Sequence, residues 1–153
     1  DENIFLKKII NKNKVNGNYD SLKNINILLI DDDIRNIFAL SGEFSEYSIN
    51  VKPAMNKDEI IQQLKSEIHF NLILIDINMT NIDSSNVLLK IRKNINSPII
   101  ALSTKVMPKE IDNNSLDTPN LYLLKPFEIE KLLSNMKILL TKKGEINEWN
   151  TIK

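Results

Sequence analysis

The strongest constraint on the fold is a series of five short strand-like runs, separated by stretches with helical periodicity. These runs lack the strict alternation of polar and apolar residues that half-exposed strands show, which is typical of a parallel sheet covered on both faces. The predicted strands are Ile25–Ile30, Ser48–Pro53, Leu72–Ile75, Pro98–Leu102 and Leu121–Leu124.

Four helices are expected around these strands, because apolar residues recur there every three or four positions. They are Asp33–Tyr47, Lys57–Glu67, Ser84–Lys93 and Phe127–Leu140. Residues 107–118 are ambiguous, and two Pro and three Asn within 108–120 weaken any helix there. The alternation of strands and helices predicts an α/β fold with a doubly wound, five-stranded parallel sheet.

The length of 153 residues corresponds to one domain with tails. We expect a linker with a short helix over residues 1–24, a folded domain over 25–141 and a tail over 142–153. Because the sequence lacks an initiator Met, we expect it to be part of a longer protein.

Composition excludes several classes of function. Lys and Arg total 20 and so do Asp and Glu, which argues against a nucleic-acid binder that relies on bulk positive charge. The absence of Cys excludes disulfides, thiolate metal sites and Cys nucleophiles. Three Gly are too few for a glycine-rich phosphate loop. No apolar run approaches the roughly 18 residues that a membrane span needs, so we expect no membrane contact.

Polar side chains follow four of the five predicted strands. Asp31 and Asp32 follow the first strand, Asp76 the third, Ser103 the fourth and Lys125 the fifth. The carboxyl ends of parallel strands lie at one edge of the sheet, and ligands bind beyond that edge. We therefore expect three carboxylates, a hydroxyl and an ammonium group to converge there.

This combination restricts the chemistry. Neighbouring carboxylates repel, so at least one pKa rises unless a cation lies among them. Oxygen ligands without Cys or clustered His favour a hard cation, and a few carboxylates with water suit Mg²⁺. Lys125 and Ser103 would add a positive charge and a donor for a phosphate-like group. A carboxylate in such a site can attack phosphorus and form an acyl phosphate.

Four segments resemble the receiver domain of two-component response regulators. They are Ile27–Asp33, Leu72–Asp83, Pro98–Thr104 and Tyr122–Phe127. The resemblance implies a flavodoxin-like (βα)5 fold with strand order 2-1-3-4-5. Two stretches, Asp31–Phe44 and Ser103–Glu110, look most like the C-terminal receivers of hybrid sensor histidine kinases.

The resemblance also implies a role for each site residue. Asp76 would be the phosphoacceptor, and Lys125 would contact the phosphoryl group. Ser103 and Tyr122 would be switch residues that repack the face formed by the fourth strand, fourth helix, fifth strand and last helix. The implied Mg²⁺ ligands are Asp31, Asp32, Asp76 and the backbone carbonyl of Asn78. The bond between Lys125 and Pro126 is expected to be cis.

The implied partners are a histidine kinase or its phosphohistidine domain, and a downstream histidine phosphotransfer protein is a further candidate. We expect no nucleic-acid partner and a cytoplasmic location, either free or as part of a membrane-bound kinase. Members of this family catalyse their own phosphorylation and dephosphorylation, which leaves open whether the chain counts as an enzyme.

Two alternatives remain open. Thr80, Ser84 and Thr104 depart from the family pattern. Thr80, Thr104 and the weak helix before the fifth strand favour a degenerate receiver that acts as a non-switching interaction module. The other alternative is a haloacid-dehalogenase-like phosphatase with Asp31 as nucleophile and Asp33 as its partner. Arg35 lies where that motif has Thr or Val, and Asp33 is about equally interpretable as a helix cap. His69 precedes the third strand, and we interpret it as structural or exposed rather than as a phosphorelay histidine.

Overall fold

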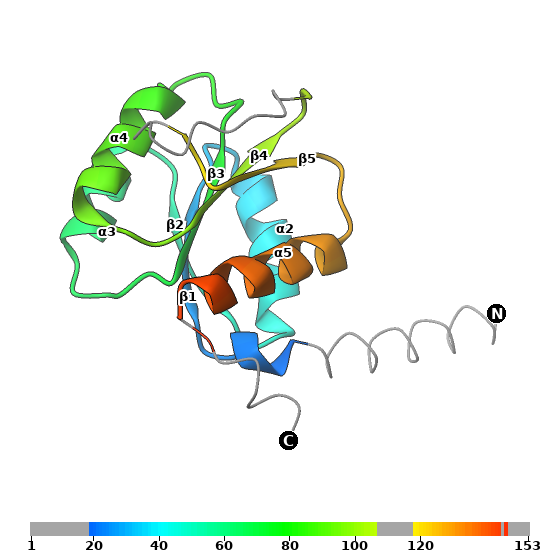
Figure 1. Cartoon of the computed structure of the whole chain (residues 1–153). Helices are drawn as coiled ribbons and strands as arrows, with labels where there is room; N and C mark the ends of the chain where they lie inside the picture. Colours follow the sequence, from blue (N-terminus) through cyan, green and yellow to red (C-terminus); the bar gives the residue numbers. More distant parts are fainter. Residues whose placement is uncertain (1–18, 107–117, 145, 147–153) are drawn as a thin grey trace.

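The computed structural model describes residues 19–106, 118–144 and 146. Its centre is a five-stranded parallel sheet with the order β2-β1-β3-β4-β5 (Figure 1). The strands are β1 (Asn26–Ile30), β2 (Asn50–Ala54), β3 (Leu72–Asp76), β4 (Ile99–Ser103) and β5 (Leu121–Leu124). The predicted α/β class, parallel pairing and strand order 2-1-3-4-5 are confirmed.

The strand register brings the predicted strand ends to one edge of the sheet. Ile30 pairs with Ile75 across β1 and β3, and Asp76 pairs with Leu102 across β3 and β4. Ser103 in turn pairs with Leu124 at the end of β5. Polar residues at or just after these positions therefore share the carboxyl edge.

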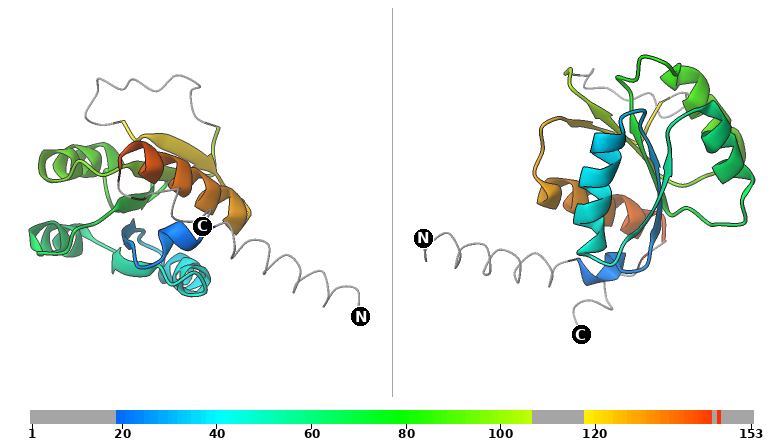
Figure 2. Two further views of the ribbon diagram at one scale, coloured as in Figure 1. Left: turned by 60° about the horizontal axis from the view of Figure 1, so that its bottom comes forward. Right: turned by 180° about the vertical axis from the view of Figure 1, so that it is seen from behind.

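Helices cover both faces of the sheet. α2 (Ile34–Ser45), α5 (Ile129–Lys142) and the 3-10 turn η1 (Asp20–Leu22) lie on one face. α3 (Lys57–Lys65) and α4 (Ser84–Asn94) lie on the other (Figures 1 and 2). Each layer buries its own apolar cluster against the sheet. The residues of β3 and β4 are buried throughout, as expected for central parallel strands.

Side-chain caps fix where three of the helices begin. Asp33 caps α2 by accepting from the Arg35 amide, which confirms its interpretation as a helix cap. Asn56 accepts from the Glu59 amide at α3, and Asp83 caps α4. Each cap satisfies an amide that the first helical turn leaves unpaired. The helices therefore begin immediately beyond the carboxyl edge of the sheet.

The folded part of the chain begins upstream of residue 25, where we placed the domain boundary. Tyr19 and Leu22 are buried and belong to the cluster beneath α2 and α5. At the other end of the domain, Gly144 follows α5 with φ +74°, the left-handed conformation that commonly terminates helices.

Three predicted features lie outside the described residues: the short helix near the N-terminus, the ambiguous stretch at 107–117 and most of the C-terminal tail. Among the helices that the structure does describe, none is both long and apolar enough to cross a membrane.

Candidate functional site

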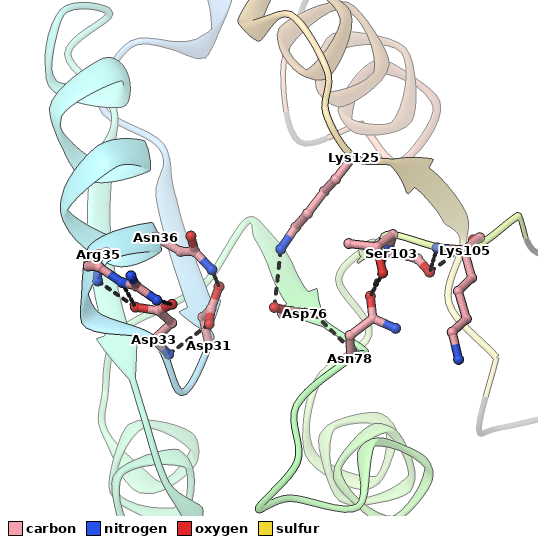
Figure 3. A network of polar contacts seen from close by, with 10 residues as sticks. Asp31, Asp33, Arg35, Asn36, Asp76, Asn78, Ser103, Lys105 and Lys125 are labelled. Atoms are coloured by element: carbon pink, nitrogen blue, oxygen red, sulfur yellow. Dashed lines mark hydrogen bonds and ion pairs between the residues drawn. The ribbon is translucent and has the colours of Figure 1, made fainter.

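The site is built around Asp76 at the end of β3 and Lys125 just after β5. The Lys125 Nζ atom lies 3.1 Å from Asp76 Oδ2, forming an ion pair at the carboxyl edge (Figure 3). The two side chains are only 22 % and 10 % exposed, so water screens their attraction less than it screens a surface pair. Two of the predicted site residues are therefore in direct contact.

The second oxygen of Asp76 is also held. The Asn78 amide donates to Asp76 Oδ1 over 2.8 Å. Asn78 Oδ1 in turn accepts from the Thr104 amide at 2.8 Å and from Thr104 Oγ1 at 3.3 Å. These bonds join the loop after β3 to the end of β4, and they fix the orientation of the Asp76 carboxylate.

Asp31 supplies a second carboxylate at the same edge. It is only 1 % exposed, and each of its oxygens accepts one hydrogen bond: Oδ1 from the Asp33 amide at 2.9 Å and Oδ2 from Asn36 Nδ2 at 3.2 Å. Burial raises the pKa of Asp31 above its ordinary value, and the charge of Asp76 contributes in the same direction. The hydrogen bonds from Asp33 and Asn36 oppose that rise. A cation near Asp31 would relieve the cost of keeping it ionised.

The oxygen atoms at the carboxyl edge can be compared with what Mg²⁺ requires. In the described part of the chain, no three His, Cys, Asp or Glu side chains are grouped so that they could hold a metal by themselves. Asp31 is buried, whereas its neighbour Asp32 is half-buried, and the convergence of all three carboxylates stays a prediction. Mg²⁺ in proteins is usually held by one or two carboxylates and keeps several waters. Two carboxylates on adjacent strands, with only oxygen donors, fit that cation.

Ser103 and Tyr122 lie on the β4–β5 side of the site. Ser103 is 1 % exposed, and its hydroxyl donates to the Lys105 carbonyl at 3.0 Å while it accepts from the Lys105 amide at 3.1 Å. Tyr122 is half-buried on β5, where it packs against the cluster beneath α3 and α4. The Ser103 hydroxyl is thus bonded within its own loop.

Asp33 contacts Arg35 instead of the residues around Asp76. Its carboxylate accepts from the Arg35 amide, and its Oδ2 atom forms an ion pair with Arg35 Nη2 at 2.8 Å (Figure 3). Both oxygens of Asp31 are hydrogen-bonded, whereas Asp76 contacts the ammonium group of Lys125. These contacts disfavour the dehalogenase-like alternative, which needs Asp31 as nucleophile and Asp33 beside it.

Two functional contacts were missed at the level of sequence. Asn36 lies five residues after Asp31, and its position on the inner side of α2 was the available signal. Thr104 was noted only as a departure from the family, not as the partner of Asn78. The expected cis bond between Lys125 and Pro126 is confirmed. His69 is exposed and precedes β3, as predicted.

Comparison with known families agrees with this geometry. A family model described as the response regulator receiver domain matches residues 27–137. The chain therefore belongs to the receiver domain family of response regulators.

Among proteins of known sequence, the nisin biosynthesis regulatory protein NisR of Lactococcus lactis is 29 % identical over 113 residues. That match covers 72 % of this chain and 48 % of NisR. The chain spans about half the length of the curated relatives it matches.

Two solved structures are also similar. A two-component response regulator from Clostridium difficile has a TM-score of 0.69 and 28 % identity, covering 78 % of this chain and 98 % of that one. The response regulator TrrA from Thermotoga maritima, solved in complex with Mg²⁺-BeF, has a TM-score of 0.63 and 26 % identity. Its match covers 75 % of this chain and 98 % of TrrA.

Proposed function

We propose that Asp76 accepts a phosphoryl group from the phosphohistidine of a histidine kinase. The observation that carries this proposal is the ion pair between Lys125 Nζ and Asp76 Oδ2, 3.1 Å apart at the carboxyl edge. Membership of the receiver family supports the same role.

In this reaction an Asp76 oxygen attacks phosphorus as the bond from phosphorus to the histidine nitrogen breaks. The imidazole leaves with that electron pair, and Asp76 becomes an acyl phosphate. Lys125 neutralises negative charge on the transferred oxygens, and such preorganised charge is a main source of catalysis in phosphoryl transfer. The Asn78 amide keeps the carboxylate in one orientation.

Asp31, Asp32, Asp76 and the backbone carbonyl of Asn78 are the proposed Mg²⁺ ligands. When bound, Mg²⁺ would supply additional positive charge for the phosphoryl oxygens. The buried, hydrogen-bonded Asp31 supports this assignment, and the Mg²⁺-BeF complex of the similar TrrA is consistent with it.

The proposed switch exchanges one set of hydrogen bonds for another. Neutral bonds such as those between Ser103 and Lys105 contribute about 0.5–1.5 kcal/mol each, whereas a bond to a charged group contributes about 1.5–3 kcal/mol. A phosphoryl group on Asp76 would therefore draw the Ser103 hydroxyl away from Lys105. Tyr122 would follow it, and the face that includes β4, β5 and α5 would repack.

The context that we propose is the receiver of a hybrid histidine kinase, supported by the resemblance of Asp31–Phe44 and Ser103–Glu110. It would act in the cytoplasm and would pass phosphoryl groups to a histidine phosphotransfer protein. Transfer from phosphorylated Asp76 to such a protein supports this context. If no phosphotransfer protein tested shortens the lifetime of the phosphoryl group on Asp76, a free-standing regulator is favoured instead.

A non-switching interaction module is the second candidate. The hydrogen bonds between Thr104 and Asn78 support it, because they restrain the end of β4, which the switch would have to move. Binding of fluoroberyllate with Mg²⁺, followed by NMR, discriminates the two. A live switch shifts the resonances of Ser103 and Tyr122, and a degenerate receiver leaves them unchanged.

Phosphorylation by phosphoramidate and Mg²⁺, read by intact mass, tests the proposal. We expect the wild-type chain to gain one phosphoryl group and Asp76→Asn to gain none. Asp58→Asn, an exposed acid in the first turn of α3, is the matched control and should label normally. Equal labelling of Asp76→Asn and wild type would reject the assignment.

A further inference from the structure

The segment Tyr19–Ile25, here called the strap, lies before the first residue of the family match at position 27. It is nevertheless part of the packed domain. Leu22 has no exposed surface, and Tyr19 and Ile25 are 8 % and 6 % exposed. Figure 2 shows η1 beside α2 and α5.

Backbone hydrogen bonds fix the strap to the sheet. The Asn24 amide donates to the Ser48 carbonyl over 2.8 Å, and the Asn50 amide donates to the Ile25 carbonyl over 2.9 Å. Asn24 adopts φ +68°, a left-handed conformation in which Asn is enriched among residues other than Gly. The path of the strap is therefore defined by specific bonds.

Tyr19 joins the strap to α5. Its hydroxyl donates to the Glu130 carbonyl at 3.2 Å and lies 2.7 Å from Ser134 Oγ. A Tyr hydroxyl has a single proton, so Ser134 donates the second bond. The ring of Tyr19 also packs edge to face on Tyr47, with centroids 6.2 Å apart. One side chain therefore bridges the end of α2 and the first two turns of α5.

The contacted turn of α5 is directly connected to the site. Glu130 lies five residues after Lys125, whose ammonium group pairs with Asp76. A movement of Lys125 towards a phosphoryl group would act on the same short stretch of chain that the Tyr19 hydroxyl holds. An ion pair, five residues of chain and a hydrogen bond thus connect Asp76 with Tyr19.

We propose that the strap couples the phosphorylation state of Asp76 to the chain that precedes the domain, with the Tyr19 hydroxyl as the coupling contact to α5. This inference rests on the proposed phosphoacceptor function. Because coupling between two sites is reciprocal, the strap in turn affects binding at Asp76.

Tyr19→Phe tests the coupling, because it keeps the ring and removes only the hydroxyl. The bonds of Tyr19 hold α5 in the unphosphorylated arrangement, so their loss should favour the phosphorylated one. We expect the affinity for fluoroberyllate with Mg²⁺ to rise about two- to tenfold, the range that the net contribution of a neutral hydrogen bond implies. Tyr47→Phe is the matched control and should leave the affinity unchanged, since the Tyr47 hydroxyl makes no hydrogen bond within the described ranges.

Hydrogen exchange supplies the second readout. In the wild-type chain, saturation with fluoroberyllate and Mg²⁺ should change the protection of amides in residues 20–25, and Tyr19→Phe should reduce that change. An affinity of Tyr19→Phe equal to or below that of wild type, or protection at 20–25 indifferent to fluoroberyllate, would overturn the coupling while leaving Asp76 as phosphoacceptor. Failure of all three chains to bind fluoroberyllate would reject the proposed function, and the coupling with it.

Discussion

Two groups of carboxylates in this molecule have very different surroundings. At the carboxyl edge, Asp31 and Asp76 are buried, held by directed hydrogen bonds and accompanied by Lys125. Along the seam between α2 and α5, Glu43 lies near several other glutamates. Partial desolvation raises the pKa of Glu43 above its ordinary value, and the charges of Glu130, Glu46 and Glu128 raise it further.

These surroundings distinguish a functional site from a surface that is merely charged. At the edge of the sheet, the Lys125 ammonium group and fixed hydrogen-bond donors orient the carboxylates, so their negative charge is available for a reaction. At the seam, glutamates that are exposed or half-buried repel one another, and apolar packing beneath them holds the helices. A cluster of acids is therefore not sufficient for a site, because burial and directed partners are also needed.

The largest expected effect tests the claim that packing holds the seam. Leu22→Ala removes a fully buried side chain between α2 and α5 and should lower the free energy of unfolding by about 2–5 kcal/mol. Urea denaturation measures this change. Ile138→Ala on α5 is the control, since that side chain is 53 % exposed and its loss should have little effect. Equal losses in the two variants would contradict the importance of the strap for packing.

The next prediction removes the ammonium group of Lys125, so that the carboxylates at the carboxyl edge lose their cation and resemble those at the seam. Lys125→Met should slow labelling by phosphoramidate about a hundredfold, because one preorganised charge on the transferred oxygens is lost. Labelling rates followed by intact mass measure the effect. Lys65→Met, in the last turn of α3, is the control and should keep the wild-type rate. A rate for Lys125→Met close to that of wild type would remove Lys125 from the mechanism.

A smaller effect concerns the buried carboxylate. Because the pKa of Asp31 is raised in the folded protein, the folded state binds this proton more tightly than the unfolded chain does. Ionised Asp31 thus destabilises the fold above its folded-state pKa, and this penalty disappears as pH falls below the ordinary value of 3.8. Without Mg²⁺, Asp31→Asn should stabilise the protein by about 1 kcal/mol at neutral pH.

Urea denaturation across pH, with Asp58→Asn as the exposed control, measures the Asp31 effect. The advantage of Asp31→Asn should shrink with acidification. A constant advantage at all pH values would show that Asp31 is not the titrating group.

The smallest effect is expected at the seam. The pKa of Glu43 is also raised, so Glu43→Gln should stabilise the fold at neutral pH, with the advantage lost below the ordinary value of 4.5. Glu43 is exposed, and solvent screening should limit the gain to at most about 0.5 kcal/mol. The same denaturation series can compare it with Glu67→Gln. If Glu43→Gln stabilised the fold as much as Asp31→Asn does, the carboxylates of the seam and of the site would not differ in the way described above.

The sheet could be predicted from sequence because each strand carries its own local signal. The apolar run that ends at Asp76 defines β3 by itself, and the parallel arrangement then places Lys125 and Asp76 at one edge. The start of β2 was predicted two residues early, at Ser48, because nothing local indicated that Ser48 adopts φ +58° and precedes the strand.

The strap could not be predicted, because its partners are distant in sequence. Tyr19 and Ser134 are separated by 115 positions, and one Tyr and one Leu among polar residues form no periodic pattern. The contact between Asn36 and Asp31 depends on how α2 is rotated relative to the sheet. Such contacts follow from tertiary packing, which local periodicity does not specify.

The central claim is that Asp76 accepts the phosphoryl group and becomes the acyl phosphate, and mapping the modified residue tests it most directly. After phosphorylation with phosphoramidate and Mg²⁺, borohydride reduction converts the phosphorylated aspartate to homoserine, which tandem mass spectrometry locates. The account predicts homoserine at position 76. Homoserine at position 31 instead would contradict it.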